Sequence, residues 1–282
     1  MSSAARSLRV ACVEWPDGLD PSQAAWDEIN KSVAAARPDL LLTNELPFGP
    51  WLAANAEFSA DAAECSIRAH EEGLAALTAL KVPAIISTRP AWNGKKLANE
   101  AFVLENGGAR PLHRKQYFPD EPGWSETSWY QGDDSGFEIA EILGIKIGVL
   151  ICTEAMFNER ARAYGKQGAA LIVVPRATGQ NVKPWKIAAQ MASTVSGAYV
   201  ASSNRVSPAF AGAPLLGASD KDGGLDPSAP GTSTEFGGAG FAYGPEAVLI
   251  AVTNATAPLV IFDVDPKTAA ATQLEYPCYV RE

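Results

Sequence analysis

The chain has 282 residues, of which 47% are hydrophobic and 20% charged, so it can bury a sizeable core and is predicted to fold. Its formal net charge of −9, with no basic block, excludes nucleic acid and anionic membrane surfaces as expected partners. The longest strongly apolar run, Ile139 to Ile151, is interrupted by Glu141 and Lys146 and is shorter than the roughly 20 residues that a membrane helix needs. The N-terminus lacks the apolar stretch of a secretory signal, so a cytoplasmic location is expected.

The first half of the chain alternates between strand and helix patterns, with a hairpin at its end. The predicted elements are a strand over Leu8–Trp15, a helix over about Pro21–Arg37, a strand over Asp39–Thr43, a helix over about Ala60–Leu80, and strands over Val82–Thr88 and Asn99–Glu105 joined by a turn at Asn93-Gly94. Residues 111–134 are rich in Pro, Gly and aromatics and are predicted to form an ordered loop with a short helix.

The second half continues the same alternation. The predicted elements are strands over Phe137–Ile142 and Ile145–Ile151, a helix over about Met156–Gln167, a strand over Ala170–Val174, a helix over Pro184–Gly197, strands over Tyr199–Ser203, Gly240–Tyr243, Val248–Thr253 and Leu259–Val264, and a short helix over Pro266–Gln273. Residues 207–238 are dense in Gly, Pro, Ser and Ala and are predicted to form a long loop. With no boundary that would split the chain, one layered α/β domain over residues 1–282 with a short C-terminal tail is expected.

Cysteine and histidine are sparse. The four cysteines lie far apart without a CxxC pair, which predicts thiols rather than a disulfide framework or a zinc site. Only two histidines are present, and His70, on the second predicted helix, is expected at the surface. We therefore predict neither a metal nor a conventional Ser-His-Asp triad.

Three residues that suit nucleophilic catalysis each follow a predicted strand. Cys152 ends an apolar strand and precedes a helix pattern, a turn whose backbone N–H groups can stabilise a thiolate and an oxyanion. Glu45 follows the strand Asp39–Thr43, and Lys115 lies beyond the strand Asn99–Glu105. Each has a simpler explanation alone, as a buried thiol, a rim carboxylate or a solvated lysine. Together they supply a nucleophile, a base and a cation for an anionic tetrahedral intermediate.

These residues and their surroundings resemble the nitrilase superfamily of carbon-nitrogen hydrolases, over nearly the whole chain and in the same order. The segments that carry the resemblance are Asn44-Glu45-Leu46-Pro47-Phe48-Gly49-Pro50-Trp51, His113-Arg114-Lys115-Gln116-Tyr117-Phe118-Pro119, Ile147-Gly148-Val149-Leu150-Ile151-Cys152-Thr153-Glu154, Ala201-Ser202-Ser203-Asn204-Arg205 and Gly240-Phe241-Ala242-Tyr243-Gly244-Pro245-Glu246. Any one match is weak, whereas all of them in order are specific.

The resemblance implies a four-layer αββα sandwich in which Glu45 is the general base, Cys152 the nucleophile and Lys115 the group that stabilises the oxyanion. Pro122 to Asp133 looks like a segment of N-carbamoyl-amine amidases, which implies that Glu126 positions Lys115 and the substrate nitrogen. It also implies a homodimer or larger homo-oligomer, and no cofactor.

The expected substrate is a small, uncharged amide or ureido (N-carbamoyl) compound. Candidate substrate-binding residues are the aromatics Trp51, Tyr117 and Trp124 near the triad, together with Thr153 and Arg176. Several amide hydrolases of this family carry Arg residues after the nucleophile that pair with a substrate carboxylate, whereas this chain has Glu154, Ala155 and Met156.

Alternatives stay open from sequence alone. Glu154 also occurs at this place in nitrilases, so hydrolysis of a nitrile to an acid and ammonia is a second candidate activity. A Cys152–His113 pairing and a redox-sensing cysteine are weaker hypotheses, and Arg205 is expected to form a structural ion pair. A binding or assembly protein of the same fold without turnover is the alternative from another class.

Overall fold

The computed structural model describes residues 6–208 and 234–281. In that part of the chain no helix combines the length and the apolar character needed to cross a bilayer. Most of the predicted loop 207–238 lies outside the described residues. Of its remainder, Phe236 is fully buried and Gly237 forms a bridge with Val206.

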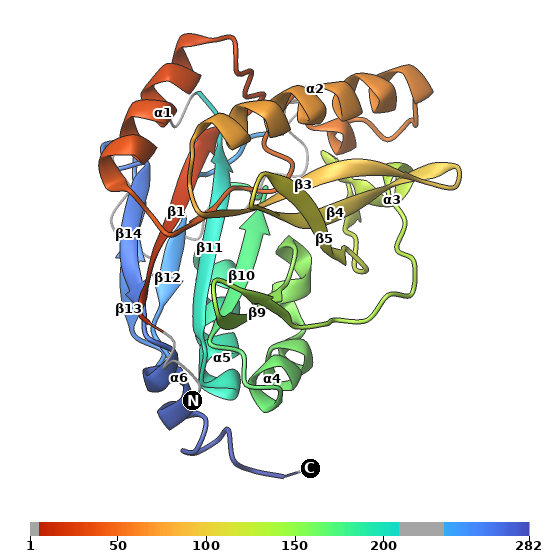
Figure 1. The fold of residues 1–282 in the computed structure, drawn as a ribbon. Coiled ribbons are helices and arrows are strands. Elements are labelled where there is room, and N and C mark those ends of the chain that lie inside the picture. Colours follow the sequence, from red (N-terminus) through yellow and green to blue (C-terminus); the bar gives the residue numbers. More distant parts are fainter. Residues whose placement is uncertain (1–5, 209–233, 282) are drawn as a thin grey trace.

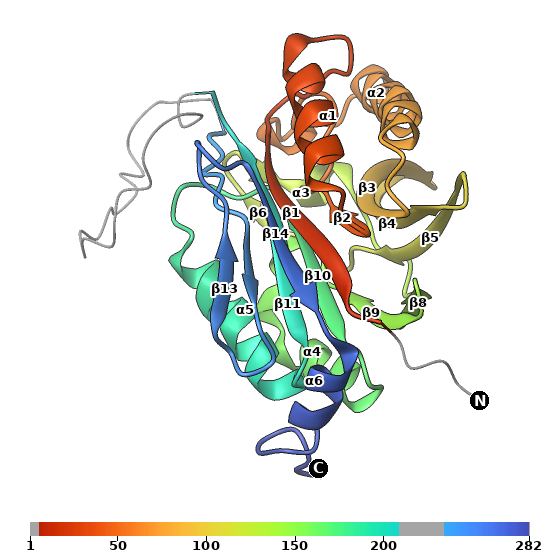
Figure 2. The same ribbon diagram turned by 60° about the vertical axis from the view of Figure 1, so that its left-hand side comes forward.

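Two mixed β-sheets form the centre of the molecule (Figures 1 and 2). The first consists of β14 (Leu259–Val264), β1 (Leu8–Pro16), β2 (Leu40–Leu42), β3 (Ala84–Asn93), β4 (Lys96–Glu105) and β5 (Gly108–Arg114). The second consists of β13 (Leu249–Val252), β12 (Phe241–Tyr243), β11 (Tyr199–Val206), β10 (Leu171–Arg176), β9 (Ile145–Val149) and β8 (Ala140–Ile142). They join where the end of β1 pairs in parallel with β11, from Glu14 opposite Asn204 to Pro16 opposite Val206.

The sheets pack face to face, because alternate residues of each strand point into a shared core. Val10 and Leu42 of the first sheet lie in one cluster with Ile147 and Val173 of the second. These strands are apolar on both faces, since each sheet is also covered on its outer side by helices.

The helices form the two outer layers. α1 (Ala24–Ala36) and α2 (Ala60–Ala79) cover the first sheet, while α4 (Asn158–Lys166) and α5 (Lys183–Ser196) cover the second. The shorter elements are the 3₁₀ turns η1 (Leu52–Ala54) and η2 (Cys152–Met156), the hairpin of β6 (Asp120–Glu121) and β7 (Trp124–Ser125), α3 (Glu126–Trp129) and α6 (Pro266–Thr272). This arrangement confirms the predicted αββα sandwich.

Two predicted elements differ from the structure near the proposed nucleophile and lysine. The region 111–134 contains the end of β5 and the β6–β7 hairpin as well as the expected short helix, α3. The helix predicted from Met156 begins at Asn158, because residues 152–156 form a separate 3₁₀ turn. The Asn93-Gly94 turn is confirmed, since Asn93 pairs with Lys96 across a hairpin.

Gly148 in β9 provides a test of how the strand before Cys152 is packed. A Cβ at this position would lie 2.4 Å from the ring of Tyr164, whose hydroxyl donates to the Val149 carbonyl at 2.8 Å. We expect Gly148→Ala to destabilise the protein by roughly 1–3 kcal/mol or more, because the ring must leave its site. Gly108→Ala is the control, since nothing lies within 4 Å of its Cβ. Equal urea midpoints for the two variants would contradict this packing.

Candidate active site

The structure brings the predicted triad together from three separate segments. Glu45 follows β2, Lys115 follows β5, and Cys152 begins the 3₁₀ turn after β9. Cys152 has a φ of +73°, a left-handed conformation that is uncommon for residues other than glycine. Such backbone strain is concentrated at functional turns that must aim one side chain.

Lys115 lies between two carboxylates. Its Nζ donates to Glu45 Oε1 at 2.8 Å and to Glu126 Oε2 at 2.6 Å, and all three side chains are at most 1% exposed. Asn99 Nδ2 also donates to Glu45 Oε1, at 2.7 Å. The geometry thus supports the predicted neighbourhood of Glu126 and Lys115 and adds Asn99, which the sequence analysis did not single out.

The charges of this cluster are strongly coupled. Burial disfavours the ammonium form of Lys115, but Glu126 and Glu45 outweigh burial and hold the Lys115 pKa well above its usual value. Burial raises the pKa of Glu126 to about 8, against the opposing effect of Lys115. One buried cation therefore lies between two buried carboxyl groups.

The Cys152 thiol is buried, with 3% of the residue exposed. Burial raises its pKa, and the charge of Glu45 raises it further, while Lys115 and a hydrogen bond from the Ala177 backbone lower it. The thiol is consequently neutral at pH 7 and needs a base to become a nucleophile. A buried, high-pKa thiol is the opposite of what a redox sensor requires.

Two carboxylate oxygens in the cluster are available to accept a hydrogen bond or a proton. Glu45 Oε2 and Glu126 Oε1 are buried and have no hydrogen-bond partner among the described residues. Unpaired acceptors of this kind are costly unless a ligand or a transferred proton uses them. They can take the thiol proton and accept hydrogen bonds from a substrate N–H group.

Three aromatic side chains form one cluster near the Glu126 segment. The ring centroids of Trp51 and Trp124 are 5.8 Å apart, and Phe236 lies 5.9 Å from Trp51 and 5.4 Å from Trp124. Trp51 Nε1 is buried without a partner among the described residues. Phe236 was missed from sequence, although an isolated aromatic in a Gly-rich stretch was a signal for it.

Tyr117 belongs to a different cluster. Its ring lies 4.2 Å from Phe157 and 5.7 Å from Phe137, and its hydroxyl accepts from Arg160 Nε at 3.0 Å. The aromatic beside Lys115 is instead Phe118, whose ring centroid is 5.9 Å from Nζ. A substrate contact by Tyr117 stays a prediction, as does one by the half-buried Thr153.

The two buried arginines bond to groups of the chain itself. Arg176 donates to Ser202 Oγ at 2.6 Å, Thr178 Oγ1 at 2.9 Å and the Ala239 carbonyl at 2.8 Å, and burial lowers its pKa to about 10. Its predicted contact with substrate stays a prediction. Arg205 forms the expected structural ion pair, with Asp17.

Arg205 also supports the segment of the proposed base. Its guanidinium donates to the backbone carbonyls of Glu45, at 3.2 Å, and of Leu46. Leu46 itself has a φ of +44°, so the backbone after Glu45 is held in an unusual conformation by a buried cation.

Both histidines are buried. His113 Nε2 donates to Glu154 Oε2 at 2.8 Å, so its contact is with a carboxylate. The predicted surface position of His70 is wrong: it is 5% exposed, its Nδ1 lies 2.8 Å from the Ser66 carbonyl, and burial lowers its pKa to about 4. The buried residues of α2 recur at helical spacing, and His70 is one of them. They are Ala63, Ser66, His70, Gly73 and Leu77.

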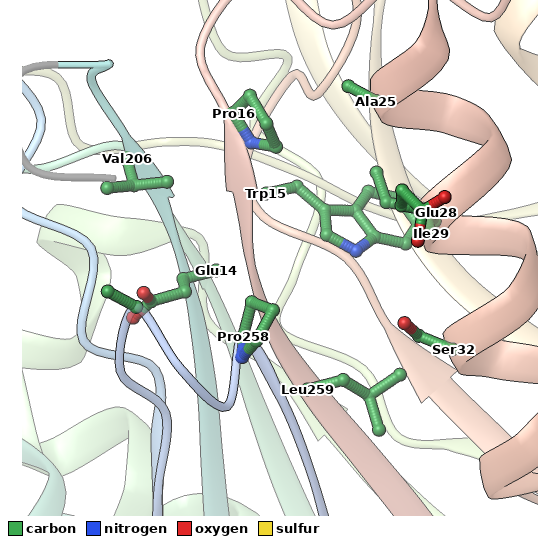
Figure 3. A pocket seen from close by; sticks show the side chains of 11 residues that line it. Glu14, Trp15, Pro16, Ala25, Glu28, Ile29, Ser32, Val206, Pro258 and Leu259 are labelled. Atoms are coloured by element: carbon green, nitrogen blue, oxygen red, sulfur yellow. The ribbon is translucent and has the colours of Figure 1, made fainter. Parts of the chain in front are cut away.

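A separate pocket of about 370 Å³ lies between α1 and the ends of β1 and β11 (Figure 3). Trp15 of β1 and Ile29 of α1 both line it, together with Pro258 and Leu259 at the start of β14. None of the residues that line it is Glu45, Lys115, Glu126 or Cys152. We therefore identify the candidate site by its side-chain geometry rather than by this cavity.

Known proteins share these features of sequence and fold. The carbon-nitrogen hydrolase family model matches residues 22–273. N-carbamoylputrescine amidase from Solanum tuberosum is 38% identical over 79 residues, which are 28% of this chain and 26% of that protein's length.

Two solved structures have the same fold. A carbon-nitrogen hydrolase from Helicobacter pylori G27 superposes with a TM-score of 0.76 at 19% identity, covering 97% of this chain and 94% of that one. A cysteine-to-alanine mutant of the Nesterenkonia AN1 amidase, from the nitrilase superfamily, gives a TM-score of 0.69 at 17% identity, with coverages of 95% and 94%. Because the family model matches residues 22–273, most of this chain, the chain belongs to the carbon-nitrogen hydrolase family.

Proposed function

We propose that the protein hydrolyses the C–N bond of a small, uncharged amide or N-carbamoyl compound and releases ammonia. The single observation that carries this proposal is the buried Glu45–Lys115–Glu126 cluster, with the buried Cys152 thiol within electrostatic reach of it. It supplies a base, a cation and a nucleophile in a site shielded from water.

The reaction starts with the neutral thiol. Glu45 takes the proton of Cys152 while the sulfur attacks the substrate carbonyl carbon, and Lys115 stabilises the resulting oxyanion. When the tetrahedral intermediate collapses, the C–N bond breaks, the nitrogen takes up a proton and ammonia leaves a thioester on Cys152.

Water then attacks the thioester, with Glu45 again accepting a proton, and the acid and free thiol are released. With an N-carbamoyl amine the released acid is a carbamic acid, which decomposes to carbon dioxide and the amine. Glu126 supports both steps by holding Lys115 and by offering Oε1 to a substrate N–H group.

The hydrogen bonds of the buried cations support the proposal that the substrate is uncharged. Arg176 and Arg205 are bonded to groups of the chain, and Lys115 is shared by two carboxylates. A substrate carboxylate would have to displace one of these contacts and would lie close to Glu45 and Glu126. The aromatic cluster of Trp51, Trp124 and Phe236 suits an apolar acyl group better.

The test is ammonia release by wild type, Cys152→Ala and Cys65→Ala on short aliphatic and aryl amides, N-carbamoyl amines and the matching nitriles. Cys65 is an exposed thiol on α2 and serves as the matched control. We expect turnover of amides or N-carbamoyl amines that is unchanged in Cys65→Ala and falls on the order of 10⁶-fold in Cys152→Ala. Turnover of nitriles alone would replace the proposal with the nitrilase activity. No turnover by a folded protein across the panel would favour the binding or assembly alternative.

A homo-oligomeric assembly stays a prediction.

A further inference from the structure

Glu154 has a buried carboxylate that the proposed reaction does not use. It lies in η2, two residues after Cys152, and is 0% exposed. Its Oε2 accepts from the Ile151 backbone N–H at 2.7 Å and from His113 Nε2 at 2.8 Å, and its Oε1 accepts from the Gln116 backbone N–H at 2.7 Å. Both oxygens are therefore engaged, whereas Glu45 and Glu126 each have one oxygen without a partner among the described residues.

The donors come from the two segments that carry the proposed nucleophile and the proposed oxyanion-stabilising group. Ile151 directly precedes Cys152, whereas His113 and Gln116 stand on either side of Lys115 in the chain. One carboxylate thus ties the backbone before the nucleophile to the backbone after the lysine and to the His113 side chain before it. Among the described strands β5 pairs with β4, and β9 pairs with β8 and β10, so strand pairing does not make this connection.

The three hydrogen bonds to Glu154 are strong enough to fix the relative positions of the groups that they join. All three are charge-assisted, since a carboxylate accepts them, and such bonds are shorter and stronger than neutral ones. Burial makes their loss expensive, because a donor left without an acceptor there keeps its desolvation cost. His113 packs against Phe137 with ring centroids 4.7 Å apart, which limits its rotation and keeps Nε2 pointed at Glu154.

We propose that Glu154 and His113 are positioning residues that fix the separation of the Cys152 thiol and the Lys115 ammonium. This rests on the proposed function, because the separation matters only if sulfur and ammonium act on the same carbonyl group. Glu154 is 0% exposed and both of its oxygens accept hydrogen bonds from the chain, so we assign it no contact with substrate. In this proposal Glu154 positions the two reacting groups. Its presence after the nucleophile therefore does not distinguish an amidase from a nitrilase.

The test measures iodoacetamide alkylation of Cys152 and of Cys65 in the same molecule by peptide mass spectrometry. Cys65 reports any change in reagent or general thiol chemistry. In wild type we expect Cys152 to react faster than the exposed Cys65 despite its burial and raised pKa. Iodoacetamide is itself a small uncharged amide, so the proposed site would hold it beside the thiol and the base Glu45. In Glu154→Gln we expect the Cys152 rate to fall about 10- to 100-fold, the effect of roughly 1 Å of misplacement, with the Cys65 rate unchanged.

Two variants of His113 test the proposal even if Glu154→Gln does not fold. His113→Gln can place a donor near the position of Nε2, whereas His113→Leu cannot. Even Leu removes only one of the three bonds to Glu154. We expect Gln to preserve the Cys152 rate and Leu to lower it, and kcat to follow the same order with KM unchanged. Glu159→Gln, an exposed carboxylate in α4, should match wild type.

The outcomes separate the two proposals. If wild-type Cys152 reacts no faster than Cys65 and no substrate is turned over, the proposed function fails. If Cys152 is activated in wild type but Glu154→Gln and His113→Leu, both folded by circular dichroism, leave its rate unchanged, the positioning role is overturned. A wild-type rate in His113→Leu together with a slow Glu154→Gln would remove His113 alone from the proposal.

Discussion

Replacing Glu45 by Gln should lower kcat by about 10²–10⁴-fold while leaving the protein almost as stable as wild type. Activity falls because the amide cannot take the proton of the neutral Cys152 thiol. Stability is retained because Lys115 keeps its 2.6 Å contact with Glu126, so the cluster becomes one cation with one carboxylate. Steady-state ammonia release and urea unfolding measure the two effects separately.

Glu57→Gln is the matched control for this variant, because it removes an exposed carboxylate that precedes α2. It should change neither quantity. Activity of Glu45→Gln within tenfold of wild type would show that another group accepts the thiol proton. A large loss of stability would instead show that Glu45 is required for the packing of the cluster.

Replacing Lys115 by Met should abolish turnover and also destabilise the protein, by roughly 3–5 kcal/mol. The lysine is 0% exposed, and without it two buried carboxylates face each other without a cation. Lys31→Met is the control. It breaks an ion pair between side chains that are 71% and 73% exposed, and such surface pairs contribute less than about 1 kcal/mol.

The destabilisation of Lys115→Met should depend on pH in a defined direction. Burial already raises the pKa of folded Glu126 from its ordinary 4.5 to about 8, and loss of the ammonium raises it further. A carboxyl group with a raised folded pKa binds its proton more tightly in the folded state. Its contribution to stability is therefore present below about pH 4.5 and is lost as the pH rises through 8 and beyond. Urea midpoints of Lys115→Met that do not fall over this range, or that match those of Lys31→Met, would contradict the electrostatic account.

The sequence predicted the parts of this molecule that depend on local patterns. Apolar periodicity located most strands and helices to within a few residues, and the order of the motifs indicated the αββα sandwich. The positions of Glu45 and Cys152 after their strands followed from the same patterns, because a strand end is a local feature. Lys115 was placed beyond the strand Asn99–Glu105, and the strand that it directly follows, β5, was not predicted. Their approach to one another depends on the stacking of two sheets, and it was expected only from the family resemblance.

Contacts between distant segments were not predictable in this way. The hydrogen bond from His113 to Glu154 and those from Arg205 to the carbonyls after β2 join segments that no local pattern relates. His70 was misplaced because a titratable side chain on a helix usually faces water, whereas here the α2 face toward the sheet includes it. Helical spacing, considered without regard to polarity, would have placed it inside.

The pairing of β1 has a consequence for how this protein is made in the cell. β1 is the first described strand to be synthesised, yet it pairs with β11 and, from Leu8 opposite Val264 to Val13 opposite Leu259, with β14. β2 pairs with the other edge of β1 and follows it closely in the chain, whereas β11 and β14 emerge from the ribosome only after most of the chain has been translated. Until then an apolar strand edge waits unpaired, a state that favours chaperone binding or aggregation. Arg205, near the end of β11, is likewise absent when Cys152 emerges, so the backbone carbonyls of Glu45 and Leu46 lack their buried cation at that stage.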